Sequence, residues 1–484
     1  MVTATPARPG APASGRGVLT GTRPLLLPER SDRPGWIRLL AGVAVIAAFA
    51  TALTVTLGAG AVRDGIDSLG HHTAPGVAAT EDLAAALADM DSQIANLLLA
   101  GDDSSLSGTR TSALTTYEQR RTQADNDLRQ ATVIAGNNTA AQHTIDTLLD
   151  QLGRYEALAA TIELLDNSEH NPAGHPSAAI LSQYRQGADL MAGMQRATQD
   201  LTNANSGVLE TAYTATRNDV TTSNRWLTTF ALILFGALLG LQVMLRRTMH
   251  RRLNPALLAA TGLALALVIG GAIATAQAGY QLRTAKQDAF TSLLALEQAR
   301  AIGFDANADE SRYLLDPDRA TQYQQAYLDK SQQLAQVNVN TLPQYYPALS
   351  TPAGGSVATI GGLFGNELAN LTFAGEDTAA QAMFDAYRNY QRDDQTLRRE
   401  ATTDLRQAIS FDTSPAVGAS DGDFAAFNTA LDGVIAINQH AFDKAVPAGI
   451  DALSGWTNWI TYVLFALAAV AIFLGIRARL AEYR

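Results

Sequence analysis

The histidines are the first residues of this sequence to consider for chemistry, because an imidazole can hold a metal ion or carry a proton. No cysteine occurs among the 484 residues, which excludes a disulfide framework, a cysteine-ligated zinc or iron–sulfur site and a cysteine nucleophile. The seven histidines include two close pairs, His71 with His72 and His170 with His175. The pairs fall at opposite ends of a long helical segment, too far apart to share a metal ion. His170 and His175 alone could hold a weakly bound ion, although two solvated loop residues are the interpretation that we favour. We predict no metal site and no cofactor.

Glycine-rich stretches are the second candidates. Gly354-Gly355 and Gly361-Gly362 lack the lysine and the preceding strand of a phosphate-binding loop, so a flexible helix start is the better interpretation. We identify no catalytic constellation. The net charge of −11, from 35 basic and 46 acidic residues, argues against a nucleic-acid binder. The sequence therefore predicts a protein that is not an enzyme and has no nucleic-acid partner.

Two asparagines interrupt apolar helical seams at matching places in the chain. Asn205 and Asn438 each end a run of residues spaced by three and four. A single asparagine in such a seam commonly fixes the register of the helices at some cost in stability. The alternative is a polar contact to a ligand or partner. We favour the register role and keep the contact role open.

Arg312 is the third polar candidate, within the segment Asp309-Glu310-Ser311-Arg312-Tyr313. It can pair with Asp309, three residues earlier, on a solvated helix face. Alternatively, its guanidinium contacts a carboxylate ligand or an acidic partner surface. The solvated pair is the interpretation that we favour.

These candidates are positioned by four long apolar runs. A helix needs about 20 apolar residues to cross a bilayer. Residues 39–62, 226–245, 256–278 and 456–476 satisfy this without Asp, Glu, Lys, Arg or His. The first run is longer than the apolar core of a signal peptide and follows a leader, residues 1–38, so we expect an uncleaved anchor. Spans without charges or prolines favour an anchoring or signal-transmitting bundle over a pore or transporter.

The distribution of charge predicts the orientation of these spans. Residues 1–38 and 246–252 each carry a net charge of +4, whereas residues 63–225 hold 10 basic and 21 acidic residues. Residues 279–455 hold 12 basic and 22 acidic residues. The positive-inside rule places both termini in the cytoplasm of a multi-pass plasma-membrane protein. The predicted order is leader 1–38, span 39–62, outer domain 63–225, span 226–245, loop 246–255, span 256–278, outer domain 279–455, span 456–476 and tail 477–484.

The order of span, outer domain and span occurs twice, which predicts a tandem duplication. One constant shift of the chain against itself aligns Asn205 with Asn438 and Trp226 with Trp459. A second, slightly smaller shift aligns Leu98-Leu99 with Leu314-Leu315. We expect the two outer domains to pack side by side along their first and last helices, as a covalent counterpart of a homodimer.

Each outer domain is predicted to be a four-helix bundle. Spacings of three and four residues define amphipathic seams. They comprise Leu83, Leu87, Met90, Ile94 and Leu97, then Met191, Met194, Thr198 and Leu201, then Phe424, Phe427, Leu431 and Val434. Helix breakers divide each domain into about four helices. They are Gly101-Asp102-Asp103, Gly136-Asn137-Asn138 and Asn171-Pro172-Ala173-Gly174 in the first domain, and Asp316-Pro317-Asp318, residues 343–355 and Thr413-Ser414-Pro415 in the second. The predicted class is an all-α membrane protein with four transmembrane helices and two extracytoplasmic bundles.

The last helix of each bundle is expected to continue into its span. Pro447 is the strong breaker in residues 438–459, and the shift that aligns the two asparagines makes Thr214 its counterpart. Proline removes one backbone hydrogen bond and kinks a helix. We therefore expect a kink at Pro447 that makes the second arm bend where the first does not.

The leader is rich in Pro, Ala, Gly and Ser and is expected to be disordered. It contains Leu25-Leu26-Leu27, three consecutive leucines flanked by Arg23 and Arg30. They could dock on a cytoplasmic partner or rest on membrane lipids. The cytoplasmic segments are too short for a kinase or a cyclase, so a sensor of this layout is expected to pass its signal to another protein.

Paired spans around four-helix outer domains resemble the ligand-binding part of bacterial chemoreceptors. The tandem arrangement, with the segment Asp309-Glu310-Ser311-Arg312-Tyr313-Leu314-Leu315-Asp316-Pro317, is similar to actinobacterial GlnX-type membrane proteins over residues 36–480. That resemblance implies two partners, a glutamine-type solute-binding lipoprotein outside and the serine/threonine kinase G inside. It implies relay of amino-acid availability between them. Two alternatives remain open: a chemoreceptor-like sensor that binds a small molecule directly, and an envelope scaffold or transport accessory without signalling.

Overall fold

The computed structural model describes residues 33–136, 138–249, 254–350 and 360–480. Within these ranges the chain is helical apart from turns, bends and one isolated bridge between Gln336 and Gly361. Four helical segments of the described chain are long and apolar enough to cross a membrane. The predicted class, an all-α multi-pass membrane protein, is confirmed.

The first half of the chain forms one bundle whose first and last helices continue into two spans. It begins with an almost straight succession of α1 (Arg33–Ser68), the π-helical turn η1 (Leu69–Thr73) and α2 (Ala74–Ala100). It then turns through η2 (Ser104–Leu106), α3 (Ser107–Ala135), α4 (Thr139–Glu169) and α5 (Ala178–Met249). α5 is a single helix of 72 residues, so the last helix of this bundle runs unbroken into its span, as predicted.

The second half repeats this plan with more interruptions. Its ascending part consists of α6 (Pro255–Arg283), the π-helical turn η3 (Thr284–Phe290) and α7 (Thr291–Leu315). The bundle continues with η4 (Pro317–Arg319), α8 (Ala320–Leu334), α9 (Leu342–Ser350), α10 (Gly362–Ala369), α11 (Glu376–Ala401) and α12 (Leu405–Asp412). It ends with α13 (Ser420–Ser454) and α14 (Trp459–Leu480).

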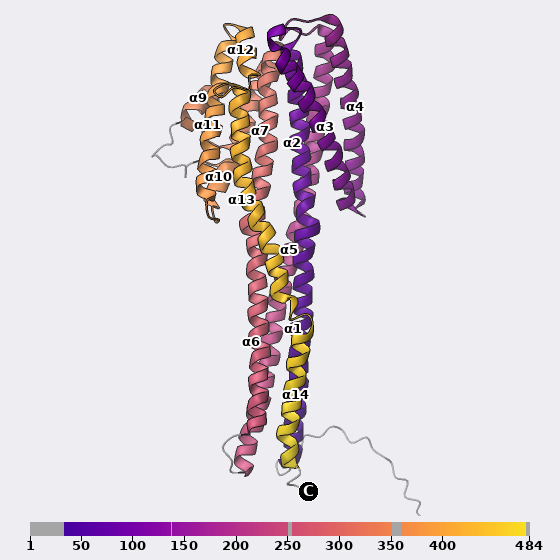
Figure 1. Ribbon diagram of the computed structural model, residues 1–484, viewed down its shortest axis with the longest axis vertical. Coiled ribbons are helices and arrows are strands. Elements are labelled where there is room, and N and C mark those ends of the chain that lie inside the picture. The colour runs from indigo at the N-terminus through magenta and orange to yellow at the C-terminus, as the bar shows by residue number, and fades with distance from the viewer. Residues whose placement is uncertain (1–32, 137, 250–253, 351–359, 481–484) are drawn as a thin grey trace, which may run out of the picture.

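The molecule is long and narrow (Figure 1). At one end α1, α5, α6 and α14 pack into a four-helix stalk. At the other end the two bundles stand side by side, and α2 of the first bundle packs along α7 of the second. The expected side-by-side packing is therefore present, and the first helices of the two copies form most of the seam.

Five of the six predicted breakers end helices where expected, whereas residues 343–350 of the break predicted over 343–355 form most of α9. α2 ends directly before Gly101, whose φ of 53° is left-handed. A Cβ at Gly101 would lie 2.7 Å from the carbonyl oxygen of Asn171, so only glycine fits this close approach. Asn138 begins α4 as an N-cap, since its Oδ1 accepts the backbone N–H of Ala141 at 3.2 Å.

The second bundle departs from a simple four-helix plan. Seven α-helices, α7 to α13, replace the expected four among its described residues. α9 begins at Leu342, and Pro343 occupies its first turn, which tolerates proline. The short α10 places Phe364 in the core, with ring centroids 5.0 Å from Tyr387 and 5.9 Å from Phe427. This aromatic packing stabilises elements that helical periodicity alone does not predict. Gly354 and Gly355 lie outside the described residues, and Gly362 begins α10.

The expected continuity of the second arm is wrong. α13 ends at Ser454 and α14 begins at Trp459, with turns between them. Pro447 lies inside α13, about two turns before this break. The side-chain amide of Asn458 donates to the carbonyl of Ser454 at 3.1 Å, and Thr461 Oγ1 donates to the carbonyl of Trp456 at 2.8 Å. These polar side chains donate to carbonyl groups that would accept backbone N–H groups if the helix were continuous.

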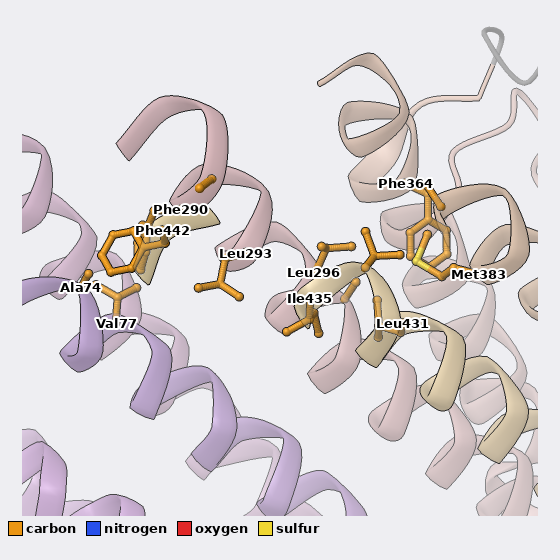
Figure 2. Packing of buried hydrophobic residues seen from close by; sticks show 14 of the residues in the cluster. Ala74, Val77, Phe290, Leu293, Leu296, Phe364, Met383, Leu431, Ile435 and Phe442 are labelled. Carbon is orange, nitrogen blue, oxygen red and sulfur yellow. The ribbon is translucent and has the colours of Figure 1, made fainter. Parts of the chain in front are cut away.

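The predicted apolar seams form the cores of the bundles. Leu83, Met90 and Met194 are fully buried in the first bundle, and Phe427 and Leu431 are fully buried in the second. Figure 2 shows part of the second core continuing toward the stalk, where Phe290 and Phe442 meet residues of α2. The first core also contains residues of α7, α11 and α12. The two bundles therefore share hydrophobic contacts and do not fold as separate units.

Glycines allow the stalk helices to approach closely. A Cβ at Gly58 would lie 2.3 Å from Ser223 Oγ, and one at Gly65 would lie 2.2 Å from Thr216 Oγ1. The two glycines are one heptad apart on α1, which is the spacing of a packed helical seam. α1 and α5 are consequently in close contact from the spans toward the bundles.

The tryptophans of the second and fourth spans lie at a similar height. Val55 faces Gly271, and the Trp456 ring covers the neighbouring Gly270. The antiparallel contacts between α1 and α5 set Trp226 opposite Val55. Indole rings prefer the membrane interface, so we expect this height to mark the outer boundary of the bilayer.

Candidate functional site: the tip and the seam between the bundles

The two bundles are joined at the end of the molecule far from the stalk. The short helix α12 belongs to the second bundle but packs on the first. Its Ile409 is fully buried, with Cδ1 2.5 Å from where a Cβ on Gly174 would stand. The Arg406 guanidinium forms an ion pair with Asp103 of the first bundle. This helix therefore fastens the two distal ends together.

The first-bundle side of the tip is built by two loops that bond to each other. The backbone N–H of Asp102 donates to the carbonyl of Asn171 at 2.9 Å, and the N–H of Gly174 donates to the carbonyl of Leu99 at 3.0 Å. His170 ends α4 in the left-handed conformation with φ 51°, unusual for a residue other than glycine. Its imidazole Nδ1 lies 3.4 Å from Asp102. The loops thus hold charged side chains on a fixed backbone frame.

Two clefts flank the Arg406–Asp103 ion pair. One has a volume of about 520 Å³ and is lined by both members of the pair, Asp102, His170 and His175. The other has a volume of about 510 Å³ and lies between η2 and α12, where Arg406 and Ser410 line it. Hydrogen bonds from Ser105 lower the pKa of Asp103. Both clefts are of the size that binds small molecules.

A buried polar seam runs below the tip, between α2 and α7. Arg312 of α7 is its centre. The Arg312 Nη2 lies 2.5 Å from Asp91 Oδ2 of the first bundle, and its Nη1 lies 2.5 Å from Asp309. Lys330 Nζ is also 2.5 Å from Asp309, and Tyr155 Oη donates to Asp91 at 3.0 Å. The expected pair with Asp309 exists, but its placement on a solvated face is wrong. Arg312 is only 7% exposed because the other bundle covers it.

Two further polar contacts cross the seam above and below Arg312. Ser92 Oγ donates to Asn307 Oδ1 at 3.1 Å, and Ser311 Oγ donates to Asn96 Oδ1 at 2.9 Å. Both pairs are separated by 215 residues in the sequence, close to the second shift of the internal repeat. α2 and α7 therefore pack in parallel with nearly equivalent residues opposite each other.

Three carboxyl groups lie beside these contacts, two fully buried and the third, Asp421, half-buried. Glu310, Asp412 and Asp421 come from α7, α12 and α13, and burial with neighbouring carboxylates raises the pKa of the first two well above the ordinary range. Burial raises the pKa of Asp421 to about 7. Ser420 donates to Glu310 at 3.1 Å, and the Ser311 hydroxyl oxygen lies 3.3 Å from Asp412 Oδ2. Protonation of the carboxyl groups and contacts with serine hydroxyls therefore stabilise the cluster.

The lower seam carries a second group of charges. Burial raises the pKa of Glu81 in α2 and of Glu297 in α7 to about 7 each. Arg300 Nη1 lies 2.8 Å from Glu297 and 3.7 Å from Asp82 of the first bundle, and its Nη2 pairs with Asp432 of α13. A seam with so many ionisable groups is costly to bury, and its stability depends on protonation and on the relative position of the helices.

The two asparagines proposed as equivalents occupy different environments. Asn438 is fully buried, and its Nδ2 donates to Glu376 Oε1 at 2.7 Å. Asn205 is half-buried, and its Nδ2 makes a long contact of 3.5 Å with the carbonyl of Gly76. Neither lies in the tip clefts. The environment of Asn438 fits the register role, because Glu376, the first residue of α11, also accepts the backbone N–H groups of Thr372 and Phe373 and so ties α13 to the loop before α11.

The remaining sequence candidates lie away from the tip or outside the described residues. Leu25, Leu26 and Leu27 belong to the leader, which the structure does not describe. Pro447 lies in α13 near the stalk. His170 and His175, by contrast, both line a tip cleft. The described residues contain no group of three or more His, Asp or Glu side chains arranged to hold a metal ion.

One catalytic-looking spacing is present at Gly418-Ala419-Ser420-Asp421-Gly422, which fits the pattern GxSxG. A nucleophilic serine of that pattern sits on a strand-to-helix turn with its hydroxyl exposed. Ser420 instead begins α13 after a turn, is fully buried, and bonds to Glu310. Its surroundings do not support nucleophilic catalysis.

The sequence candidates did not include Asp91, Asp103 or Arg406. Asp91 could have been suspected, because Asp89, Asp91, Ser92 and Asn96 put polar groups on several faces of a helix otherwise rich in Ala and Leu. Such polar groups in an apolar helix are expected to have polar contacts to another helix. Arg406 carries no such signal, since its role depends on α12 crossing to the other bundle.

The fold and site define a class: a multi-pass membrane protein with two helical bundles in tandem that meet at a polar seam. Residues 65–214 are similar to the actinobacterial sensor domain family. This match covers the first bundle from the end of α1 into α5, including Asp91, Asp103 and the tip loops. No curated protein and no solved structure matches the chain. The family match indicates a sensor role.

Proposed function

We propose that this protein is a transmembrane sensor whose outer bundles receive a signal at their distal tip. The observation that carries the proposal is the family match over the bundle whose helices continue directly into two spans. A domain built this way can convert a contact at the tip into movement of the helices that cross the membrane.

The seam supports a relative displacement of the bundles as the signal. The contacts across it are ion pairs and hydrogen bonds around Arg312 and Arg300, whose geometry depends on a small number of donors and acceptors. Small shifts at such interfaces exchange one set of partners for another. α5 would carry the shift of the first bundle as one rigid helix. The break between α13 and α14 would let the second arm respond differently.

The finer function that we propose is relay of amino-acid availability from a solute-binding lipoprotein to a cytoplasmic serine/threonine kinase. Its support is the resemblance in layout to GlnX-type proteins together with an accessible, charged tip. The tip presents Asp102 and His170 beside Arg406, a mixed set of charges that a protein partner can match with complementary ones.

A second candidate is direct binding of a small zwitterion in the tip clefts. The observation that favours it is the ion pair of Arg406 with Asp103, beside Asp102, in one cleft of about 520 Å³. A guanidinium binds an α-carboxylate, and a carboxylate binds an α-ammonium. An amino acid that exchanges partners with the Arg406–Asp103 pair would loosen the link between the bundles.

Photo-cross-linking in intact cells separates these possibilities. A photoreactive residue at Ser410, exposed beside a cleft, should form an adduct with an extracytoplasmic binding protein. The same residue at Thr161, exposed on α4, serves as the control. Absence of any adduct at Ser410, combined with saturable binding of radiolabelled glutamine to the purified protein, would favour direct binding. Absence of both would contradict a receptor at the tip.

The relay is tested by phosphorylation. Arg406→Ala should abolish the difference in phosphorylation of the kinase's substrates between amino-acid-rich and starved cells. Arg154→Ala, which removes an exposed pair on α4, should preserve that difference. An Arg406→Ala strain with a normal response would exclude the tip from the relay.

A further inference from the structure

Two π-helical turns occur at matching places in the two halves of the chain. η1 interrupts the first long helix at Leu69–Thr73, and η3 interrupts its counterpart at Thr284–Phe290. The shift that aligns Leu98 with Leu314 places Leu69 on Ala285, within η3, and both side chains are buried. π-helical turns are rare and are frequent at functional sites. Their presence in both copies shows that this irregularity is a property of the repeated unit.

A threonine closes each turn in the same way. Thr73 Oγ1 donates to the carbonyl of Ser68 at 3.1 Å, and Thr291 Oγ1 donates to the carbonyl of Lys286 at 2.9 Å. Each bond reaches back five residues, the spacing of the π-helix, where an α-helical threonine reaches back four. Pro75 follows the first turn and has no N–H to donate to the carbonyl of His71. Local sequence therefore supports the wider turn in each copy.

Each π turn contacts the last helix of the other copy. A Cβ at Gly70 of η1 would lie 2.4 Å from Val446 of α13. Lys286 of η3 lies 2.6 Å from Glu210 of α5 and 5.6 Å above the Tyr213 ring. The shift that aligns Asn205 with Asn438 also aligns Tyr213 with Val446. The two turns thus make reciprocal contacts across the pseudo-twofold axis, at the junction between the stalk and the bundles.

The upper ends of the turns meet in one apolar layer. Figure 2 shows Ala74 and Val77, just after η1, beside Phe290 at the end of η3 and Phe442 of α13. The Phe290 and Phe442 ring centroids are 5.6 Å apart. A change in one turn therefore displaces side chains that the other turn also contacts.

We propose that the paired π turns are a register switch between the stalk and the bundles. A π turn contains one residue more than an α turn. If it relaxes to regular α-helix, the extra residue rotates the helix beyond it by about 100° relative to the stalk. In the first copy this would replace Thr80 by Ala79 at the position that faces Thr202 of α5. The reciprocal contacts make the two turns relax together.

Disulfide trapping distinguishes the two registers, and the absence of native cysteine makes it specific. Thr80 Oγ1 lies 2.9 Å from Thr202 Oγ1 in the structure, so Thr80→Cys with Thr202→Cys should form a disulfide in the π register. Ala79→Cys with Thr202→Cys should form one in the α register. Position 78 faces Thr202 in neither register, so Ala78→Cys with Thr202→Cys measures the background level of disulfide formation. The experiment uses full-length protein in native membranes and needs no ligand.

Single-residue deletions test whether the turn absorbs the extra residue. Deletion of His72, which is exposed in η1, should leave the melting temperature nearly unchanged, keep the 80–202 disulfide and reduce the 79–202 disulfide to background. Deletion of Gln287 in η3 should also reduce the 79–202 disulfide, because the turns are coupled. Deletion of Val208, exposed on the regular helix α5 at a similar height, should destabilise the protein.

Two results would overturn the switch. One is a 79–202 disulfide at background level in the full-length chain. The other is a 79–202 disulfide that persists after His72 is deleted. Neither result bears on what the tip binds, so the register switch can fail while the sensor function stands.

Discussion

At the scale of single residues, the seam depends on Arg312 and on the carboxylates around it. The Arg312 guanidinium pairs with Asp91 of the first bundle and with Asp309 of its own helix, and Lys330 also pairs with Asp309. A buried ion pair contributes little net stability, but removal of one partner leaves an uncompensated buried charge. This asymmetry makes Arg312 a sensitive position even if no ligand ever contacts it.

We expect Arg312→Ala to lower the free energy of unfolding by about 3–5 kcal/mol, because Asp91 loses its cation inside the seam. Thermal unfolding in detergent measures this loss. Arg154→Ala is the matched control, since Arg154 and Asp150 form an exposed pair 2.8 Å apart on α4. Equal effects of the two substitutions would show that Arg312 is not effectively buried in solution.

Protonation of the lower seam predicts a pH dependence. The pKa values of Glu81 and Glu297 are raised from 4.5 to about 7, so the folded state binds protons that the unfolded state has lost. Stability should therefore fall as pH rises from 4.5 to about 7. Melting temperatures across this range should show the decline, and Glu81→Gln with Glu297→Gln should make it less steep, while Asp421, whose pKa is also raised to about 7, retains part of it. An unchanged slope in the double variant would assign the dependence to other groups.

At the scale of elements, the two arms that leave the bundles are unequal. α5 is continuous through bundle and span, whereas the second arm is interrupted between Ser454 and Trp459. The glycine contacts on α1 hold the continuous arm close. Because Gly65 faces Thr216 with no room for a Cβ, the α1–α5 distance is fixed at that point.

Gly65→Ala should destabilise the stalk, because its Cβ would lie 2.2 Å from Thr216 Oγ1 and 3.0 Å from Thr216 Cβ. Gly60→Ala should be neutral or stabilising, since nothing lies within 4 Å of the added methyl group and alanine is the better helix former. Thermal unfolding in detergent compares the two variants. Thr216→Ala removes the nearest atom and should restore part of the stability of Gly65→Ala; a variant without such rescue would place the strain elsewhere.

The sequence predicts elements with strong periodicity and misses those set by contacts between distant residues. Spacing by three and four residues located Leu83, Met90 and Phe427 in the cores, where they are buried. The break after Ser454 was not anticipated, because the intervening Gly455 is compatible with a helix in an apolar run. α10 and α12 depend on Phe364 and Ile409 filling cores built from remote helices. For the same reason, helical spacing identified a local partner for Arg312 but could not reveal Asp91, 221 residues away.

At the scale of the whole molecule, the charge distribution still sets the expected orientation. Single cysteines at Ser105 and Thr378 should react with a membrane-impermeant reagent in intact cells, because both lie in the acidic outer segments. A cysteine at Thr248, in the basic connection between the second and third spans, should react only after the cells are permeabilised. Labelling at position 248 alone would reverse the topology.

The seam between α2 and α7 bears on how such a protein can be regulated in the cell. An interface rich in buried charge would bind weakly between separate chains and would dissociate when the protein is scarce. Here both sides belong to one polypeptide, so the local concentration of each side at the other is set by the connection and not by expression. The fraction of molecules in which the seam is closed is then the same whatever the number of protein molecules in the cell. A cell could change the number of these proteins without changing the threshold at which each one responds.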